Sequence, residues 1–495
     1  MAATQRDGQP SGSDSPHNNS AGDISTSSSS QLALEREKEA QVAAERTKSR
    51  GSTRSQVVAA ALPELPAEDE KKDGDVERSA AAEPPANPMM DPSAFPDGGW
   101  QAWLVVLGSF CNMFVSFGWI NCIGIFQNYY QTHQLQSMSP STIAWIPSLE
   151  TFMMFVGGPI FGTLIDNYGP RYVLLVGSFL HVFGLMMTSI SSEYYQIILA
   201  QGICSPLGAS MIFYPSVTCV ASWFLRHRAL ALGIAASGSS LGGVIIPIMV
   251  QRLVDRVGFG WTMRICAFLI LGLLVVSNLT LRSRIPPHKK PVRIMNFITP
   301  LTEVPFILIC IASFAFFFGM FLPFTFVILQ ARRYGMSPSL AGYLIAILNA
   351  ASIFGRTIPG YLGDRIGRFN MMVAMTYLSA ILVLALWMPS RANAPIIIFA
   401  AFYGFSSGAF VSLAPALVAQ ISDVRQMGVR SGTLFAIVSF AALTGNPIGG
   451  ALVPDVQHGS FEKLQIFSGV VMAVGSTIFL AARVYLAGWS LKKIV

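Results

Sequence analysis

The sequence predicts an all-α membrane protein, in which twelve transmembrane helices form two six-helix bundles after a disordered N-terminal tail. Of its 495 residues, 52% are hydrophobic and only 12% are charged, roughly half the charged fraction of ordinary soluble domains. Residues 98–149 contain no Asp, Glu, Lys or Arg, which leaves room for two spanning helices of about 20 residues each. The apolar segments are too long for barrel strands and lack their alternation, so helices are predicted.

The first 96 residues are predicted to be a disordered cytoplasmic tail. They are rich in Ser, Ala, Glu and Pro, and up to Asp97 the chain carries ten basic and 17 acidic residues, a net charge of −7. Such a composition cannot bury enough apolar surface to offset the entropy lost on ordering. A region regulated by phosphorylation is the alternative interpretation.

Twelve later segments are each long and apolar enough to span a bilayer. The first six are expected to form an N-terminal bundle over residues 97–281 and the last six a C-terminal bundle over 303–495, joined by a cytoplasmic loop over 282–302. The predicted spans are residues 102–126, 141–164, 172–191, 195–218, 229–250, 261–281, 303–329, 340–362, 371–389, 395–420, 430–452 and 463–487.

Loop charges predict the orientation, because Lys and Arg are enriched in cytoplasmic loops. If the N-terminus is inside, the inside loops and the C-terminal tail carry 14 basic residues and the outside loops carry seven. Both termini are therefore expected in the cytoplasm. We expect the plasma membrane, with the vacuolar membrane as the alternative. The positive charges are sparse and form no stripe, so nucleic-acid binding is not expected.

The sequence indicates neither an enzyme nor a cofactor. All six cysteines fall inside predicted spans at spacings that do not suggest metal ligation, and we interpret them as small packing residues. The chain has no nucleophile motif, nucleotide-binding loop or paired intramembrane His or Asp cluster. We therefore expect no catalytic residues, no metal site and no cofactor.

A short motif occurs twice, after the second and the eighth predicted span. Its Gly, Asp and Gly recur at an offset of 198 residues, which indicates duplication of a six-helix unit. The glycines permit a tight turn and close helix approach, and the carboxylate can hold a helix N-terminus or an arginine while one face is closed. The residues assigned to conformational gating are Gly162, Asp166, Gly169, Arg171, Gly360, Asp364, Arg365, Gly367 and Arg368.

Two such halves, related by an axis along the membrane normal, resemble the major facilitator superfamily. The first copy of the motif departs from the superfamily pattern, because Asn167 stands where an arginine is usual. The second copy has Arg365 at that position.

Two further motifs resemble those of the monocarboxylate transporter family, especially its fungal branch. The first runs from Asp97 to Trp103 and the second from Trp223 to Gly238. The first suits a turn before the membrane with interfacial tryptophans, and small residues in the second permit a close helix crossing. The resemblance covers residues 95–490. The motif residues are Asp97, Gly98, Gly99, Trp100, Trp103, Phe224, Arg226, Arg228, Gly233 and Gly238.

Arg356 and Glu150 are the charged residues inside predicted spans that we single out as functional candidates, because charge is costly in a membrane. A structural ion pair is the alternative role for Arg356, and an ion pair or a position near water is the alternative for Glu150. The resemblance implies that Arg356, in the eighth span, anchors a substrate carboxylate, which a guanidinium can bind through two hydrogen bonds. Glu150, about one-third along the second span, is the candidate for carrying a coupling proton.

The sequence departs from the proton-coupled family members at two positions. Asn121 stands where they carry a lysine, and Ser352 where they carry an aspartate. These departures favour an organic molecule that is larger and less acidic than lactate or pyruvate. Besides Arg356, the candidate substrate-binding residues are Asn121, Asn349, Ser352, Trp145, Tyr214, Phe317, Tyr403 and Asn446.

The predicted function is secondary-active transport by alternating access. The predicted cargo is a monocarboxylate or a related small organic molecule, including a fungal secondary metabolite moved in either direction, and a proton is the candidate partner for symport. A carrier of a riboflavin-like vitamin is one alternative. A non-transporting nutrient sensor that signals through the tail is the other. The expected partners are the small organic substrate and the lipid bilayer, and the sequence names no partner protein.

Overall fold

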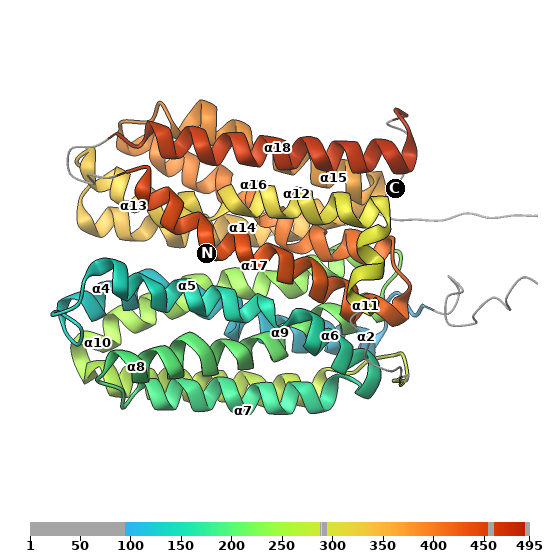
Figure 1. Ribbon diagram of the computed structural model, residues 1–495, viewed down its shortest axis with the longest axis horizontal. Helices are drawn as coiled ribbons and strands as arrows, with labels where there is room; N and C mark the ends of the chain where they lie inside the picture. Colours follow the sequence, from blue (N-terminus) through green and yellow to red (C-terminus); the bar gives the residue numbers. More distant parts are fainter. Residues whose placement is uncertain (1–94, 288, 290–294, 454–459, 491–495) are drawn as a thin grey trace, which may run out of the picture. The chain divides into compact units, whose positions relative to one another are not determined.

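Helices make up the regular secondary structure of the part of the chain that the computed structural model describes, residues 95–287, 289, 295–453 and 460–490 (Figure 1). Among these residues, eleven continuous helices are long and apolar enough to cross a membrane. The predicted tail lies outside the described residues except for its last two positions. The all-helical class is confirmed.

The elements are divided below into an N-terminal half, α2 to α10, and a C-terminal half, α12 to α18. The N-terminal half contains α2 (Trp100–Val115), α3 (Phe117–Ile120), α4 (Ile123–Thr132), α5 (Pro140–Val156), α6 (Gly158–Tyr168), α7 (Pro170–Thr188), α8 (Tyr194–Ile197), the π-helix η2 (Ile198–Cys204), α9 (Ser205–Trp223) and α10 (Arg228–Thr280). Two short helices follow, α11 (Met295–Ile298) and η3 (Thr299–Thr302). The C-terminal half contains α12 (Val304–Met320), α13 (Leu322–Arg333), α14 (Pro338–Ile366), α15 (Arg368–Ile381), the π-helix η4 (Leu382–Trp387), α16 (Asn393–Gln420), η5 (Val424–Gln426), α17 (Met427–Ala451) and α18 (Glu462–Ala487).

One long helix accounts for the difference between twelve predicted spans and eleven continuous helices. The predicted spans 229–250 and 261–281 both lie within the 53 residues of α10. Gly258, between them, has φ 78° and ψ 167°, a conformation that is not helical and that glycine adopts readily. The chain therefore reverses direction through a single residue, and α10 holds two spans.

The duplication seen in the sequence is also visible in how the helices begin. The side chain of Ser139 accepts a hydrogen bond from the backbone N–H of Thr142 and caps α5. Ser337, 198 residues later, caps α14 by accepting from the N–H of Leu340. Serine is a preferred residue at this position because its oxygen satisfies an otherwise unpaired N–H of the first turn.

The glycines that end the two motif copies have positive φ angles. Gly169 has φ 83° and separates α6 from α7, and Gly367 has φ 103° and separates α14 from α15. Residues with a Cβ rarely adopt such angles. The glycines therefore allow the tight turns that join these helix pairs.

The two halves pack against each other through a few helices. From the N-terminal half, α10 packs against α14, and α5 and α6 pack against α17 of the C-terminal half. Figure 1 shows α17 running beside α5 and α6. The end of the helices that carries residues 166–171 and 364–368 is called the motif end below.

Candidate functional site

A small cavity lies between the two halves, and four of the predicted substrate-binding residues line it. These four are Asn121, Asn349, Ser352 and Arg356. The cavity is about 20 Å³, room for about one water molecule. Its other lining residues are Phe117, Ile120, Ser239, Met320, Phe321, Phe324, Ser407, Gly408 and Val411.

Arg356 is buried at this cavity and reaches across the interface between the halves. Its guanidinium donates to the backbone carbonyl of Ala236, at 2.6 Å, and to the Ser239 hydroxyl, both on α10. It also donates to the Ser352 hydroxyl, one turn earlier on α14, at 3.1 Å. Among the described residues, no carboxylate lies within ion-pair distance of Arg356. Arg356 is therefore a buried cation without a counter-ion at the wall of a cavity, which makes it a candidate for a functional role.

Two amide side chains join the halves on the same cavity wall. Asn349 on α14 donates to the Asn121 side-chain oxygen at 3.2 Å, and Asn121 donates back to the carbonyl of Phe117 at 2.9 Å. Gly243 of α10 faces both amides, and a side chain there would lie within 3 Å of each. This close packing keeps the cavity small in this conformation.

The other five candidates lie elsewhere. Phe317 and Tyr403 are buried one layer behind the cavity: the Phe317 ring contacts that of Phe321, and the Tyr403 hydroxyl donates to the Met320 carbonyl at 2.7 Å.

Tyr214 is buried and donates to the carbonyl of Phe155 at 2.8 Å. Asn446 accepts a hydrogen bond from Thr325 at 3.2 Å, and Trp145 is 56% exposed. None of these three lines the cavity in this conformation.

The sequence reasoning missed Ser239, the serine that binds the Arg356 guanidinium. It belongs to the run of small residues in α10 that was interpreted as a packing surface. The hydroxyl of Ser239 within this run was the signal that could have indicated a polar contact.

Glu150 lies apart from the cavity. It is 2% exposed and accepts a hydrogen bond from Gln201 of η2 at 3.2 Å. The hydroxyl of Tyr130, on α4, donates to the other end of the same amide at 2.5 Å. None of these three residues lines the cavity.

The carboxylates of the two motif copies each bind the start of a helix in the opposite half. Asp166 accepts hydrogen bonds from the backbone N–H groups of Gly428 and Val429, at 3.2 and 3.0 Å. Asp364 accepts from the N–H groups of Ala229 and Leu230, at 3.1 and 2.9 Å. A negative charge at a helix N-terminus is favourable because it meets unpaired N–H groups and the positive end of the helix dipole.

Glycines at these contacts let the backbones touch. A methyl group on Gly360 would lie 2.6 Å from the carbonyl oxygen of Ala229, and one on Gly162 would overlap the carbonyl of Gly428. Gly233 faces the carbonyl of Arg356 in the same way, whereas Gly238 faces that of Phe110 within the N-terminal half. The motif end is therefore tightly closed in this conformation.

The arginines of the two copies differ in their surroundings. Arg368 is buried, forms a 2.7 Å ion pair with Asp364 and donates to the carbonyl of Leu225 in the opposite half at 2.6 Å. Arg365 is exposed, with its guanidinium over the ring of Tyr361, and Arg171 is exposed as well. The structure thus brings only Arg368 into the contact between the halves.

The two family motifs bind each other. A side-chain oxygen of Asp97 accepts hydrogen bonds from the backbone N–H groups of Leu225, Arg226 and His227, at 2.6, 2.7 and 3.4 Å. Asp97 itself has φ 48°. The carboxylate at the head of α2 therefore fixes the loop that leads into α10.

The aromatic and basic residues of the two motifs have distinct positions. The Trp103 ring meets the Phe224 ring edge-on at 5.3 Å, whereas Trp100 is 78% exposed. Arg228 is buried and donates to the carbonyl of Ala419 in the opposite half at 2.9 Å, whereas Arg226 is exposed. Gly98 and Gly99, with no neighbour in reach of a side chain, form the turn before α2.

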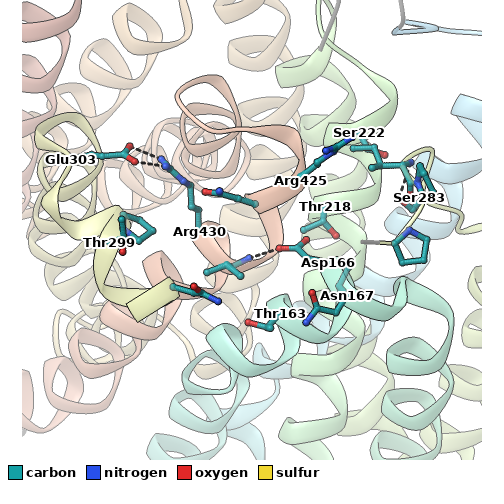
Figure 2. A pocket seen from close by; sticks show the side chains of 18 residues that line it. Thr163, Asp166, Asn167, Thr218, Ser222, Ser283, Thr299, Glu303, Arg425 and Arg430 are labelled. Carbon is teal, nitrogen blue, oxygen red and sulfur yellow. Dashed lines mark hydrogen bonds and ion pairs between the residues drawn. The ribbon is translucent and has the colours of Figure 1, made fainter. Parts of the chain in front are cut away.

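A larger cavity of about 610 Å³ opens beside the Asp166 contact at the motif end (Figure 2). Its walls come from α6, α9, the segment between the halves and the start of α17, and most of its polar side chains are neutral. Arg430 in its wall is paired with Glu303 through two hydrogen bonds. The sequence analysis did not predict this cavity, because its residues come from four separate segments.

Comparison with known proteins gives a consistent result. The chain matches the Major Facilitator Superfamily over residues 105–390 and 307–492. It is 55% identical to MFS-type transporter 1 of an Ophiocordyceps species, over 86% of this chain and 93% of that protein. It is 45% identical to the fujikurins efflux protein of Gibberella fujikuroi, over 78% and 83% of the two chains. It is 40% identical to the agnestins efflux protein of Paecilomyces divaricatus, over 77% and 87%.

Solved structures agree in fold. The crystal structure of the transporter FucP in the outward conformation superposes with a TM-score of 0.60, covering 77% of this chain and 97% of that one. The sequence identity is 15%, so this likeness concerns the fold alone.

Proposed function

This chain belongs to the Major Facilitator Superfamily and is a multi-pass membrane transporter of that type, and from this premise we propose that it exports an acidic, largely apolar organic metabolite by alternating access. The observation that carries the proposal is Arg356, a buried cation with no carboxylate partner among the described residues, at the cavity between the halves. Two relatives are named as efflux proteins for fujikurins and agnestins.

The cavity walls support an anion with an apolar body. Arg356 supplies a permanent charge and a planar set of donors that suits a carboxylate or a related acidic oxygen pair. Asn121 and Asn349 add neutral donors and acceptors, and Phe321 and Phe324 add aromatic surface. Lactate and pyruvate offer little apolar surface to these aromatic side chains. We therefore propose a larger acid, which is still a monocarboxylate.

The contacts at the motif end support alternating access. With the motif end closed by Asp166 and Asp364, substrate leaves toward the opposite end. Release of both helix starts opens the motif end. We place the motif end and both termini in the cytoplasm of a plasma-membrane protein, following the loop charges. The 610 Å³ cavity then faces the compartment from which substrate is taken.

The proposal is tested by reconstituting the purified protein into liposomes and measuring transport by mass spectrometry. The panel contains fujikurins, aspyridones and agnestins, after which three related efflux proteins are named. It also contains lactate, pyruvate and riboflavin. We expect at least one of the three metabolite groups to be transported and the Arg356→Gln variant to fall to the level of protein-free liposomes. Transport of riboflavin alone, or of none of the panel, contradicts the proposal.

A matched control separates the role of this one arginine from loss of positive charge in general. Arg391 is exposed and lies 3.9 Å from Glu462 at the surface. The Arg391→Gln variant is therefore expected to transport at the wild-type rate. If Arg356→Gln and Arg391→Gln behave alike, Arg356 is not the anchor.

A further inference from the structure

The N-terminal half contains a buried carboxyl group outside the substrate cavity. Glu150 on α5 is 2% exposed and accepts a hydrogen bond from the neutral amide of Gln201, at 3.2 Å. Tyr130 donates to that amide at 2.5 Å and so fixes which way its N–H groups point. The chain Tyr130–Gln201–Glu150 thus presents a donor to the carboxyl group from a defined direction.

No opposite charge holds this carboxyl group. The titratable group in its hydrogen-bonded chain is the Tyr130 hydroxyl from α4, and the buried thiol of Cys122 precedes the same helix. Among the other elements packed against α5, α9 and η2 contain no Asp, Glu, Lys, Arg or His, and the one charged residue of α17, Arg430, is paired with Glu303. An ionisable group without a counter-ion inside the membrane is the arrangement found in proton relays of pumps and transporters.

The carboxyl group is connected to the substrate cavity through a break in the first span. The helix is interrupted between Val115 and Ile123, with the single turn α3 in between. Asn121, at the end of α3, lines the cavity and binds Asn349. In the same segment, the Trp119 ring contacts the Phe126 ring, with 5.1 Å between centroids, and Phe126 stacks on Tyr130 at 6.4 Å. Tyr130 is the residue that binds Gln201, so one short segment connects the cavity with the residues that hold Glu150.

We infer that Glu150, oriented by Gln201 and Tyr130, binds the proton whose movement drives transport, and that residues 116–122 carry the effect of proton binding to the Asn121–Asn349 contact. A proton from water adds to a carboxylate oxygen on one side of the membrane and leaves from it on the other, with no other bond made or broken. This inference rests on the proposed transport function.

Comparison of the halves supports a specific role for this group. At the 198-residue offset of the two motif copies, Glu150 corresponds to Leu348, which is also fully buried. The same position is therefore apolar in one half and ionisable in the other. The π-helix η2 supplies Gln201, and such helices occur frequently at functional sites.

Infrared difference spectroscopy of the protein in lipid tests proton binding without any substrate. We expect a carboxyl C=O band that titrates in the wild type and is missing from Glu150→Gln. Glu150→Asp keeps a carboxyl group and is expected to keep a titrating band at a shifted position. If this variant also loses the band, the loss is caused by misfolding and not by removal of the carboxyl group. The same titrating band in Glu150→Gln as in the wild type overturns the inference.

A matched pair of tyrosine variants tests the hydrogen-bonded chain. Tyr130→Phe removes the hydroxyl that orients Gln201 and is expected to move the midpoint of the titration. Tyr194→Phe removes a hydroxyl that donates to the carbonyl of Thr142, on the same helix as Glu150, at 3.0 Å, and is expected to leave the midpoint unchanged. Equal midpoints in all three proteins contradict the assigned role of Tyr130.

Transport assays distinguish failure of this inference from failure of the proposed function. With whichever of fujikurins, aspyridones or agnestins is transported, Glu150→Gln is expected to exchange labelled for unlabelled compound without a pH gradient. It is expected to lose accumulation driven by an imposed pH gradient. Accumulation at the wild-type level overturns the inference and leaves the transport function standing, whereas absence of exchange in the wild type contradicts the transport function itself.

Discussion

Asp364 accepts a hydrogen bond from the backbone N–H of Leu230 at 2.9 Å, across the interface between the two halves. The Asp166 carboxylate binds the N–H of Val429 at 3.0 Å in the reciprocal position. Each half thus supplies the carboxylate that the other half's helix start needs. The closed motif end depends on these two contacts together, and separating the halves breaks both.

The first prediction concerns these caps. Asp364→Ala is expected to cost the closed state about 0.5–2 kcal/mol, the usual value of a helix cap, which is roughly a two- to thirtyfold shift toward the open motif end. Spin labels at the exposed residues Tyr168 and Ile366 would report the shift as a longer distance between the halves. Asp423→Ala removes a similar carboxylate contact, with the N–H of Arg425 inside the C-terminal half, and should leave that distance unchanged.

The second prediction concerns the close approach of the backbones. A methyl group in Gly162→Ala overlaps the Gly428 carbonyl, so the variant should be unable to close the motif end without a cost of about 1–3 kcal/mol. Transport should fall while the amount of folded protein stays constant. Gly342→Ala is the matched control, because a methyl group there, on α14, meets no atom within 4 Å. Equal transport by the two variants would show that close approach at Gly162 is dispensable.

The third prediction concerns the contact between the family motifs. Asp97→Ala removes the acceptor of three backbone N–H groups in the loop before α10. We expect a loss of about 1–2 kcal/mol of stability, measured as a lower midpoint of thermal unfolding in detergent. Asp255→Ala changes an exposed aspartate and should shift the midpoint little. An unchanged midpoint in Asp97→Ala would mean that the loop is held by other contacts.

The fourth prediction compares two ion pairs. Arg430 is buried and paired with Glu303, which is 41% exposed. Glu303→Gln leaves the guanidinium without its counter-ion and should lower stability by about 1–2 kcal/mol, less than a fully buried pair because of solvent screening. Glu462→Gln breaks the exposed pair with Arg391 and should have almost no effect on the unfolding midpoint. A larger loss in Glu462→Gln than in Glu303→Gln would contradict this assignment.

Much of the fold could be predicted from the sequence because membrane helices are read from local composition. The turn inside α10 is an exception: residues 251–260 contain no proline and include residues that favour helices, so the chain stays helical on both sides of Gly258. The sequence analysis used three repeated positions. The Ser-Pro pairs at 139 and 337 are separated by the same 198 residues, so the repeat also includes the caps of α5 and α14.

The cavity could be predicted only in part. Asn349, Ser352 and Arg356 recur at helical spacing on one face of α14, so the arginine indicated which neighbours share its surroundings. Tyr214, Phe317 and Tyr403 sit on other helices, and whether they reach the cavity depends on the rotation and depth of each helix, which packing decides. Hydropathy contains no information on the rotation or the depth of a helix.

The reciprocal capping has a consequence for the origin of the chain. A single six-helix unit of this kind would have a carboxylate with no helix start to bind and a helix start with no carboxylate to cap it. Two identical units facing each other about a two-fold axis satisfy both needs, because residue i meets residue j and j meets i. A parallel homodimer of one such unit would therefore close the same end with the same two contacts, and duplication and fusion of its gene would keep both within a single chain.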